Sequence, residues 1–433
     1  IFNQEIRSAE NLPRVLMMAC QAALNHRGVA HISIPSDIMR VAAGERDPRE
    51  KVLVFNSKLI PSSHEIDQVA NTLNNAKKVT ILYGGGSFEA KEELQTISSI
   101  LKAPLVHTTR SKDILDNRLE NYVGGIGLMG VRSANHAVNE CDALLVVGSS
   151  FAFKEYYPTK ADIIQIDNNI TRLGARVGIT QGLLGDCKLT LQELTSRLKP
   201  KADDSFLREA QDMKIKGMDH QKYFAKPSKP GEYIHPQALT ERIGMLASDD
   251  AIFCVGTGSV TIYCNNYLQL NGKQRLLWSW NLASLGWALP SGLGCQLASP
   301  GRQVIVPVGD GDFHMLIADF ITLVKYNLPV TFIVYNNSCY RFIELEESGE
   351  GNPPFGTQFL NPNYAAFAEA HGAFGIEVKD YSKIDEALKT AFKCGKPAIV
   401  DVHVDPNDLF IPPKITPKMA LKFAESKIKG WGL

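Results

Sequence analysis

The chain has 433 residues, of which 44% are hydrophobic and 21% are charged, so it has room for two or three globular domains and is not a disordered protein. Its 46 Lys and Arg residues balance 46 Asp and Glu residues, and a formal net charge of zero gives no electrostatic reason to expect a nucleic-acid partner. Eight scattered cysteines without metal-ligand spacing predict reduced thiols in a cytoplasmic protein, and no apolar run is long enough to span a bilayer.

The first 40 residues predict the end of a domain whose beginning is missing. The stretch "LPRVLMMACQAALNHRG" has apolar residues at helical spacing and ends in a glycine, and residues 29–38 follow it as an expected strand. The chain starts without Met, and this helix and strand have no evident partners in the sequence. Residues 41–62 are charged and interrupted by prolines, which is typical of a linker.

Residues 63–200 alternate between apolar runs of strand length and helical patterns, which predicts a central domain with a parallel sheet covered on both faces. The expected strands are 78–86, 104–109, 143–150 and 162–169, and the expected helices are 89–102 and 132–141. Residues 201–232 are polar and show no sustained core pattern, so we expect a connecting helix and a linker.

Residues 233–405 predict a second α/β sheet, and residues 406–433 form a tail. The expected strands are 251–258, 303–308, 330–337 and 398–404, and the expected helices are 236–246, one that continues from Phe313 to Val324, and 363–373. The predicted fold class is therefore α/β, with successive doubly wound parallel-sheet domains of which the first is incomplete.

The stretch "VIVPVGDGDF" places two glycines and two aspartates between an apolar strand and a helical pattern. Glycines and a helix start suit a phosphate, but no Lys stands where a nucleotide-binding P-loop carries one, and Asp310 would repel an anion. The next strand ends in "NN", and the carboxyl ends of successive parallel strands meet at one edge, so Asp310 and Asn336–Asn337 should converge. Their oxygens suit Mg²⁺ that bridges Asp310 to a diphosphate, whereas the alternative is a pair of simple turns.

The motifs "GDGDF…YNNSCYRF", "VGTGS" and "NLASLGWALPSGLG" resemble the pyrophosphate-binding domain of thiamin diphosphate (ThDP) enzymes, whose signature is GDG followed by NN. Further stretches are similar to the FAD-containing pyruvate oxidase group, and most of all to pyruvate dehydrogenases that reduce a quinone: "APLVHTTRSKDIL", "VGGIGLMG", "YYPTKADIIQID", "HPQALTERI" and "DLFIPPKITPKMA". The resemblance extends over almost the whole chain and implies the domain order of a ThDP enzyme.

The resemblance implies that Asp310, Asn337 and the main-chain oxygen of Cys339 hold Mg²⁺. Leu285 would force the two rings of ThDP into a V, although a simple position in a helix core is the alternative. Phe342 and Ile343 would form the wall of the substrate pocket. The residues expected at ThDP are Gly258, Ser259, Ala283, Ser284, Leu285, Gly309, Asp310, Gly311, Asn337, Ser338, Cys339 and Tyr340.

Two residues depart from the family pattern. Gly256 stands where relatives often carry an acidic residue, and Asp312 stands where they commonly carry a small one. Asp312 adds a negative charge near the expected diphosphate, which leaves its role open.

The stretch "GGIGLMG" contains a literal G-x-G-x-x-G, but it follows polar "DNRLENYV" instead of an apolar strand, so we do not expect a Rossmann fingerprint. The resemblance nevertheless assigns this loop to FAD, together with the loops after two later strands. The residues expected at FAD are Gly127, Leu128, Met129, Gly130, Phe151, Ala152, Phe153, Lys154, Glu155, Asp167 and Asn169. A central domain that holds ADP, or no nucleotide, is the alternative.

The implied activity is the oxidative decarboxylation of pyruvate to acetate and CO₂ through ThDP, with electrons passed through FAD to a quinone. The alternatives are an acetolactate synthase, which condenses two 2-oxo acids, an oxygen-linked pyruvate oxidase that makes acetyl phosphate, and a non-catalytic protein that kept the ThDP fold.

Residues 417–433 are basic and amphipathic, so the tail is a candidate for peripheral contact with the inner face of the cell membrane, with a solvated terminus as the alternative.

The family activates ThDP with a Glu from the early part of its pyrimidine-binding domain. We expect that Glu upstream of Ile1, since Glu5 and Glu10 lie in the wrong place, and we therefore expect the 433 residues alone to be inactive. The family also builds each site between two subunits, so the resemblance implies a homo-oligomer, at least a dimer, and we expect a tetramer.

Overall fold

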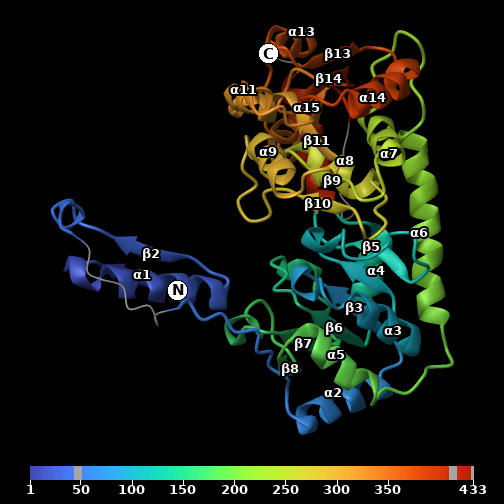
Figure 1. Ribbon diagram of the computed structural model, residues 1–433. Helices are drawn as coiled ribbons and strands as arrows, with labels where there is room; N and C mark the ends of the chain where they lie inside the picture. The colour runs from blue at the N-terminus through green and yellow to red at the C-terminus, as the bar shows by residue number, and fades with distance from the viewer. Residues whose placement is uncertain (43–50, 409–416, 431–433) are drawn as a thin grey trace. The chain divides into compact units, whose positions relative to one another are not determined.

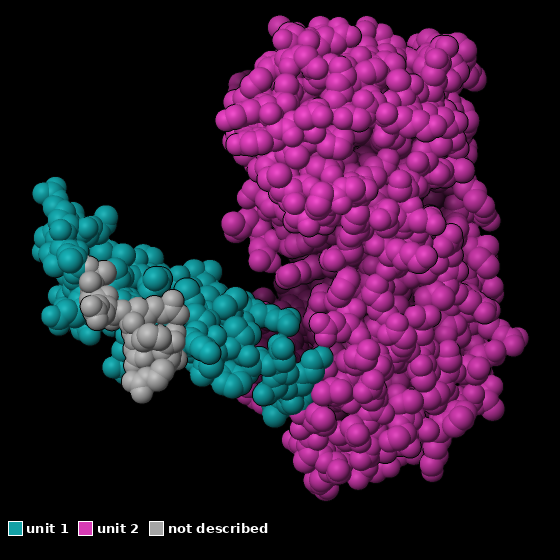
Figure 2. Space-filling view, viewed as in Figure 1, with its two compact units in different colours: residues 1–59 teal, residues 60–433 magenta. Residues whose placement is uncertain are grey.

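The computed structural model describes residues 1–42, 51–408 and 417–430, apart from the side chains of residues 419 and 430. The chain divides into two compact units, residues 1–59 and residues 60–433, which Figure 2 colours separately. Among the described residues, no helix has both the length and the apolar character that crossing a membrane requires.

Unit 1 is a small β-α-β arrangement. Strand β1 (Phe2–Glu5) pairs in parallel with β2 (Ala30–Ser33), and α1 (Leu12–His26) connects them. The helix and β2 were predicted, but β1 was not, because "FNQE" is short and three of its four residues are exposed. The expected helix-strand unit therefore does have a strand partner within this unit.

Unit 2 contains two six-stranded parallel sheets, which Figure 1 shows with helices on both faces. The first sheet has the strand order β5-β4-β3-β6-β7-β8, and all of its pairings are parallel. Its strands are β3 (Val79–Tyr83), β4 (Leu105–His107), β5 (Tyr122–Gly125), β6 (Ala143–Val147), β7 (Asp162–Asp167) and β8 (Gln181–Leu184). The doubly wound α/β class predicted from the sequence is confirmed.

Alternate residues of these strands point into two separate cores. Ile81 and Leu145 pack with α2 (Ser63–Asn75), α3 (Lys91–Leu101) and α5 (Cys187–Thr195) on one face. Leu82 and Leu144 pack with α4 (Arg132–Asn139) and the start of α6 (Ser205–Phe224) on the other face. The first two turns of α6 carry the buried Phe206 and Ala210, so the expected connecting helix is part of the core at its beginning.

The second sheet has the order β10-β9-β11-β12-β14-β13 and is also fully parallel. Its strands are β9 (Ile252–Cys254), β10 (Arg275–Leu277), β11 (Val304–Gly309), β12 (Val330–Asn336), β13 (Phe374–Val378) and β14 (Ala398–His403). One face is covered by α7 (Pro236–Leu246), α8 (Ser259–Tyr267) and α14 (Ile384–Lys393), and the other by α9 (Ala288–Ala298), α10 (Asp310–Met315), α11 (Phe320–Lys325) and α13 (Tyr364–Ala370). Helix α12 (Arg341–Gly349) contacts α15 (Pro417–Gly430).

The helix expected from Phe313 to Val324 is interrupted. Leu316 has an extended φ of −135°, and a short 3₁₀ turn at Ile317–Asp319 separates α10 from α11. The apolar residues of both pieces still face one core, which is why the sequence pattern reads as a single helix. Other 3₁₀ turns are Ala9–Asn11, Ile38–Arg40, Gly85–Ser87, Thr109–Ser111, Lys154–Tyr156, Ile170–Arg172 and Tyr381–Lys383.

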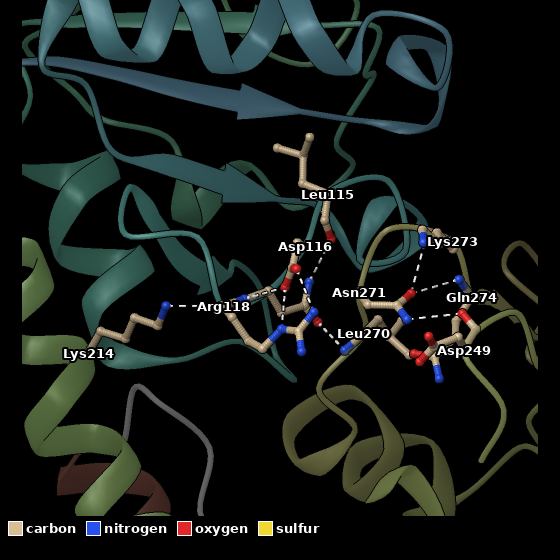
Figure 3. A network of polar contacts seen from close by, with 10 residues as sticks. Leu115, Asp116, Arg118, Lys214, Asp249, Leu270, Asn271, Lys273 and Gln274 are labelled. Carbon is tan, nitrogen blue, oxygen red and sulfur yellow. Dashed lines mark hydrogen bonds and ion pairs between the residues drawn. The ribbon is translucent and has the colours of Figure 1, made fainter.

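Polar loops connect the two sheets of unit 2. The main chain of Asn117 donates to Leu270 O at 2.8 Å, and the Asn117 carboxamide oxygen accepts from Leu270 N at 3.0 Å. Beside this pair, Asp116 and Asn271 form a β-bridge, and Figure 3 shows how their side chains are held by Arg118 on one loop and by Lys273 and Gln274 on the other. The central sheet is thereby tied to the second sheet through backbone groups.

Candidate functional site

Three loops meet at the carboxyl edge of the second sheet, next to the point where the strand order reverses between β9 and β11. They follow β9, β11 and β12, and such an edge is where open α/β sheets bind ligands. Asp310, the first residue of α10, lies at the centre of this edge and is buried. The structure thus brings together the GDG and NN motifs, as the sequence predicted.

The Asp310 carboxylate is surrounded by donors. Its Oδ2 accepts from the main-chain N–H groups of Asn337 at 2.9 Å and Ser338 at 2.6 Å, and its Oδ1 accepts from Gly311 N at 2.8 Å. Burial raises the pKa of Asp310, while these N–H groups and Asn361 act in the opposite direction by favouring the charged form. The result is a fixed carboxylate with acceptor capacity left on Oδ1.

The sequence reasoning missed Asn361. Its Nδ2 donates to Asp310 Oδ2 at 2.7 Å and to Asn336 Oδ1 at 2.8 Å, and its Oδ1 accepts from the Tyr364 hydroxyl at 2.9 Å. His314 Nε2 in turn lies 2.7 Å from that hydroxyl. Asn361 sits in a polar loop ahead of α13, and nothing in "LNPNY" distinguishes it from an ordinary helix-start residue.

The two asparagines at the end of β12 have different partners. Asn336 Nδ2 donates to Asp401 Oδ1 at 2.9 Å, so its side chain is held toward β14. Asn337 Oδ1 instead accepts from Cys339 N at 3.1 Å within the loop itself.

Among the described residues, one cluster of acidic and histidine side chains has metal-ligand spacing. It consists of Glu377, Asp401 and His403 at the ends of β13 and β14. Asp401 is already engaged there by Asn336 and Tyr364.

The expected diphosphate glycines differ in their surroundings. Gly258 has a φ of +124°, a conformation that favours glycine, and a Cβ there would meet no atom within 4 Å. Gly309 also faces open space, but a Cβ on Gly311 would lie 2.4 Å from the ring of Tyr340. Gly258 immediately precedes α8, whose first turn has no side-chain cap. Its uncapped N–H groups suit an anion, whereas Gly311 serves the close packing of Tyr340.

Asp312 joins the loop after β9 to the loop before α9. Its Oδ2 accepts from Thr257 N at 2.8 Å, and its Oδ1 accepts from Gly286 N. The side chain is 3% exposed, and burial raises its pKa to about 6. The Asp312 carboxylate therefore faces two backbone N–H groups of neighbouring loops.

Leu285 lies in the loop before α9, in a turn, and its side chain is 38% exposed. The alternative of a helix-core leucine is therefore wrong, because the helix begins three residues later at Ala288. Ala283 and Ser284 are exposed beside it, and Thr257 Oγ1 donates to Ser284 O at 3.0 Å. Phe342 and Ile343 lie in the first turn of α12, where Ile343 is exposed.

The loops expected at FAD gather at the carboxyl edge of the first sheet. A Cβ on Gly127 would lie 3.5 Å from the ring of Phe151 and 3.9 Å from that of Phe153, so the loops after β5 and β6 touch. Leu128 and Phe153 are exposed there, while Asp167 at the end of β7 is buried and accepts from Asn169 N at 2.9 Å. Ala152, Lys154 and Glu155 are exposed in the same loop, and Met129 O accepts from Asn265 Nδ2 at 2.9 Å.

The reading that "GGIGLMG" does not follow a strand is wrong. Strand β5 includes the first two glycines of this stretch and α4 follows at Arg132, but β5 is an edge strand of the sheet and only four residues long. Counted in chain order from β3, the sheet runs 3-2-1-4-5-6, the usual order of dinucleotide-binding sheets, in which the fingerprint follows the first strand and not the third. The motif thus has strand context but not the position of a Rossmann fingerprint.

Comparison with known proteins gives the family. The C-terminal TPP binding domain of thiamine pyrophosphate enzymes matches residues 256–402, and the central domain of these enzymes matches residues 66–194. Thiamine pyrophosphate is another name for ThDP.

Three relatives illustrate the range of similarity. The Bacillus subtilis protein YdaP, provisionally named a thiamine pyrophosphate-containing protein, is 34% identical over 436 residues, which cover 100% of this chain and 75% of YdaP. Pyruvate oxidase of Lactiplantibacillus plantarum is 26% identical over 93% of this chain and 68% of its own length. Acetolactate synthase of Bacillus subtilis is 24% identical over 94% of this chain and 72% of its own length. The chain belongs to the thiamine pyrophosphate enzyme family.

Proposed function

We propose that the protein decarboxylates pyruvate oxidatively to acetate and CO₂, using ThDP, Mg²⁺ and FAD, and passes the electrons to a quinone. The observation that carries the cofactor part of this proposal is the buried Asp310, held by donors from the ends of β11 and β12 at the switch point of the second sheet. The similarity to pyruvate oxidase supports the 2-oxo acid substrate.

The residues at this edge fit ThDP and Mg²⁺. Asp310, Asn337 and the main-chain oxygen of Cys339 would hold the ion, since all three offer the hard oxygens that Mg²⁺ prefers. Gly258 and the uncapped start of α8 would hold the diphosphate, because no Cβ blocks the approach and the first N–H groups of the helix favour an anion. When bound, ThDP supplies an electron sink for the loss of CO₂ from a 2-oxo acid.

The chain's own residues would orient and dry this site. Asn361 fixes the Asp310 carboxylate and is itself fixed by Tyr364, so the proposed metal ligand has little freedom to turn. Asp312 holds the loop after β9 against the loop that carries Leu285, which would keep that side chain at the cofactor. Phe342 and Ile343 would exclude water from the substrate side.

The first sheet supports a flavin nucleotide. Its strand order is the one that binds dinucleotides across the switch point, and the loops after β5, β6 and β7 present exposed apolar side chains beside the buried Asp167. Asp167 would accept from a ribose hydroxyl, and Leu128 and Phe153 would contact an aromatic ring.

Two experiments test the proposal. Asp310→Ala in the full-length protein should raise the dissociation constant of ThDP–Mg²⁺ at least about a hundredfold, because a ligand to the ion is lost, whereas Asp319→Ala on the exposed turn should leave it unchanged. Unaltered ThDP affinity in a folded Asp310→Ala protein would refute the metal-bridge account.

The second experiment uses the flavin: anaerobic pyruvate should bleach the flavin of an oxidase. A flavin that stays oxidised would favour acetolactate synthase, and phosphate-dependent acetyl phosphate with hydrogen peroxide would favour an oxygen-linked oxidase.

We further propose a homo-oligomer, built as a tetramer, in which a partner subunit covers the exposed apolar side chains around the ThDP loops. Leu282 and Leu360 are 83% and 95% exposed, and Phe355 is 89% exposed. Isolated apolar residues are common on surfaces, but three large ones in the loops around a cofactor edge suit an interface. Light scattering that finds a monomer at micromolar concentration would refute this assembly.

Membrane contact through the tail remains a proposal of its own. Helix α15 packs on α12, where Ser426 Oγ donates to Asn352 O at 2.6 Å and Lys422 pairs with Glu350. Leu421 and Ile428, one helical heptad apart, are exposed on the same side of α15. Co-sedimentation with anionic liposomes should fall when both are changed to Asp, and co-sedimentation that survives deletion of 417–433 would exclude the tail.

A further inference from the structure

Unit 2 contains a cavity of about 520 Å³ that is separate from the ThDP edge. It is lined by β5 and the start of α4 on the first sheet, by the middle of α6, and by α7 and α8 of the second sheet. Of the residues expected at FAD, Gly130 alone lines it, so it is not the predicted flavin site. Its volume is in the range of small-molecule sites.

The charge of the cavity has one sign. Its described lining contains four cationic side chains, Lys112, Arg132, Lys214 and Lys216, and no carboxylate. Lys112 is buried at depth, and its Nζ donates to the main-chain oxygen of Asn265 at 2.5 Å. Arg132 and Lys216 are exposed at the rim and have no ion pair within the part of the chain that the structure describes. An anion would therefore meet the uncompensated positive charge of Arg132 and Lys216 at the entrance, and two lysines further inside.

Two carboxylates that lie beside lining residues, Asp116 and Asp408, have other partners. Asp116 acts to raise the pKa of Lys214, but its carboxylate is bound to Arg118 at 2.7 Å. Figure 3 shows the Lys214 side chain reaching toward the loop that carries Asp116 and Arg118. Lys214 Nζ itself donates to the main-chain oxygens of Asn117 at 3.2 Å and Leu119 at 3.4 Å. Behind the wall, Asp408 accepts from Gln237 Nε2 at 2.8 Å and from the Tyr263 hydroxyl at 2.9 Å.

Two side chains that line the cavity carry buried oxygens without donors. Gln237 and Asn265 are 4% and 6% exposed, and neither Gln237 Oε1 nor Asn265 Oδ1 has a hydrogen-bond partner among the described residues. Rotating either amide by half a turn would not help, because Gln237 Nε2 must face Asp408 and Asn265 Nδ2 must face Met129 O. Buried polar atoms in native proteins are almost always paired, so these oxygens call for a donor from outside the chain.

The start of α4 adds a third feature. Val131, Arg132 and Ser133 line the cavity, and this eight-residue helix has no side-chain cap at its first turn. Free N–H groups at a helix start, together with the helix dipole, favour a phosphate. The unpaired cations and the unpaired oxygens nearby are independent of this helix end and point to the same ligand chemistry.

We propose that this cavity binds a phosphorylated small molecule that also carries hydroxyl groups. Its phosphate lies among Lys112, Lys214 and the rim cations, and its hydroxyls donate to Gln237 Oε1 and Asn265 Oδ1. Asn265 also holds Met129 in the loop expected at FAD, and α8, which carries Asn265, begins at the expected diphosphate loop. A ligand here would contact elements that reach both expected cofactor sites. Binding at this cavity does not depend on the proposed reaction.

The test uses the full-length protein loaded with FAD, so that the flavin site is filled, and calorimetric titration with ribose 5-phosphate and with inorganic phosphate. Ribose 5-phosphate should bind, and the double variant Arg132→Glu/Lys216→Glu should weaken it at least about tenfold because two attractive charges become repulsive. The matched control is Lys222→Glu, on α6 but outside the cavity, which should bind as the wild type does. Flavin absorbance, read separately, reports on the proposed function.

Several outcomes overturn the proposal. The cavity is not an organic-phosphate site if ribose 5-phosphate fails to bind, or if it binds equally to the wild type and the rim variant. If inorganic phosphate binds as tightly as ribose 5-phosphate, the assignment of Gln237 and Asn265 as hydroxyl acceptors is wrong. Gln237→Leu checks this second point, since it removes the unpaired oxygen and should selectively weaken ribose 5-phosphate.

Discussion

The carboxylate of Asp312 occupies the space beside Gly256, because a Cβ on residue 256 would lie 2.3 Å from Asp312 Oδ2. The same oxygen accepts from Thr257 N at 2.8 Å, and Oδ1 accepts from Gly286 N. The sequence analysis singled out these two positions separately, and they are one feature in space. An acidic group reaches the loop after β9 from the helix after β11, and residue 256 must be small to admit it.

This relationship predicts a coupling between the two residues. Gly256→Ala should destabilise the protein by about 1–3 kcal/mol, since the new methyl group forces the buried carboxylate out of place. Asp312→Ala should cost a similar amount because it leaves two backbone N–H groups without an acceptor. In the double variant the methyl group meets no carboxylate. The double variant should therefore lose less stability than the sum of the losses in the two single variants.

Urea unfolding of the four proteins measures this coupling as a double-mutant cycle. Gly294→Ala is the control, because Gly294 is exposed in α9 and a Cβ there meets nothing within 4 Å. It should be neutral or slightly stabilising. Strict additivity of Gly256→Ala and Asp312→Ala would show that the two residues do not share the space.

Asn361 predicts a role in cofactor binding that the motifs do not reveal. Asn361→Ala removes the side-chain donor to Asp310 Oδ2 and frees that carboxylate to turn, so the affinity for ThDP–Mg²⁺ should fall about tenfold. Asn363→Ala is the matched control, since Asn363 caps α13 by accepting from Ala366 N at 2.8 Å and does not contact Asp310. It should lower stability but leave cofactor affinity unchanged. Equal cofactor affinities in both variants would contradict the role of Asn361.

Cys254 and Cys295 predict a disulfide under oxidation. Cys254 Sγ in β9 donates to Cys295 Sγ in α9 at 3.5 Å, and this hydrogen bond lowers the pKa of Cys295 to about 7. A thiolate at that position can react at neutral pH, and a two-electron oxidant such as diamide would take the hydrogens of both thiols as the S–S bond forms.

Thiol titration after diamide treatment checks this pair. The exposed thiol of Cys20 is removed first by Cys20→Ser. In that background the oxidised protein should have two fewer free thiols than the reduced protein. Adding Cys295→Ser should abolish that loss, whereas adding Cys394→Ser should not. Retention of all thiols in the Cys20→Ser protein would mean that the two sulfurs cannot reach bonding geometry.

Lys112 predicts a pH dependence of stability. Its pKa is lowered to about 7, mainly by burial, while Cys264 acts to raise the pKa and the nearby Lys214 acts to lower it. The unfolded chain keeps the lysine protonated up to its ordinary pKa of about 10.4, so between pH 7 and 10 the unfolded state binds more protons than the folded state. The Lys112 contribution to the free energy of unfolding should therefore rise with pH, by at most about 1.4 kcal/mol per unit.

Lys112→Met should remove that part of the slope, as measured by urea unfolding at several pH values from 7 to 10. Lys222→Met on the exposed side of α6 is the control and should keep the wild-type slope. A Lys112→Met protein with the same slope as the wild type would show that the folded protein keeps this lysine charged.

The central strands were predictable because each is a nearly continuous apolar run. Strands β3, β6 and β12 are buried along their whole length, and no other element explains such runs between turns. Strands β1, β5, β8, β10 and β13 were missed because they are short and carry polar or glycine residues. Edge strands bury less, so their sequences carry less of the signal.

The convergence of Asp310 with the end of β12 was also determined by the sequence, since parallel strands bring their carboxyl ends to one edge whatever the details of the loops. Tertiary structure alone decided that Asn361 completes this site and that Leu285 lies in a turn ahead of its helix. It also decided that the Asp312 carboxylate fills the space beside Gly256 and binds the N–H groups of two loops. A strand or helix is encoded by its own neighbours along the chain. The partner of a buried carboxylate is chosen by packing between segments that lie far apart in the sequence, and only the folded chain contains that information.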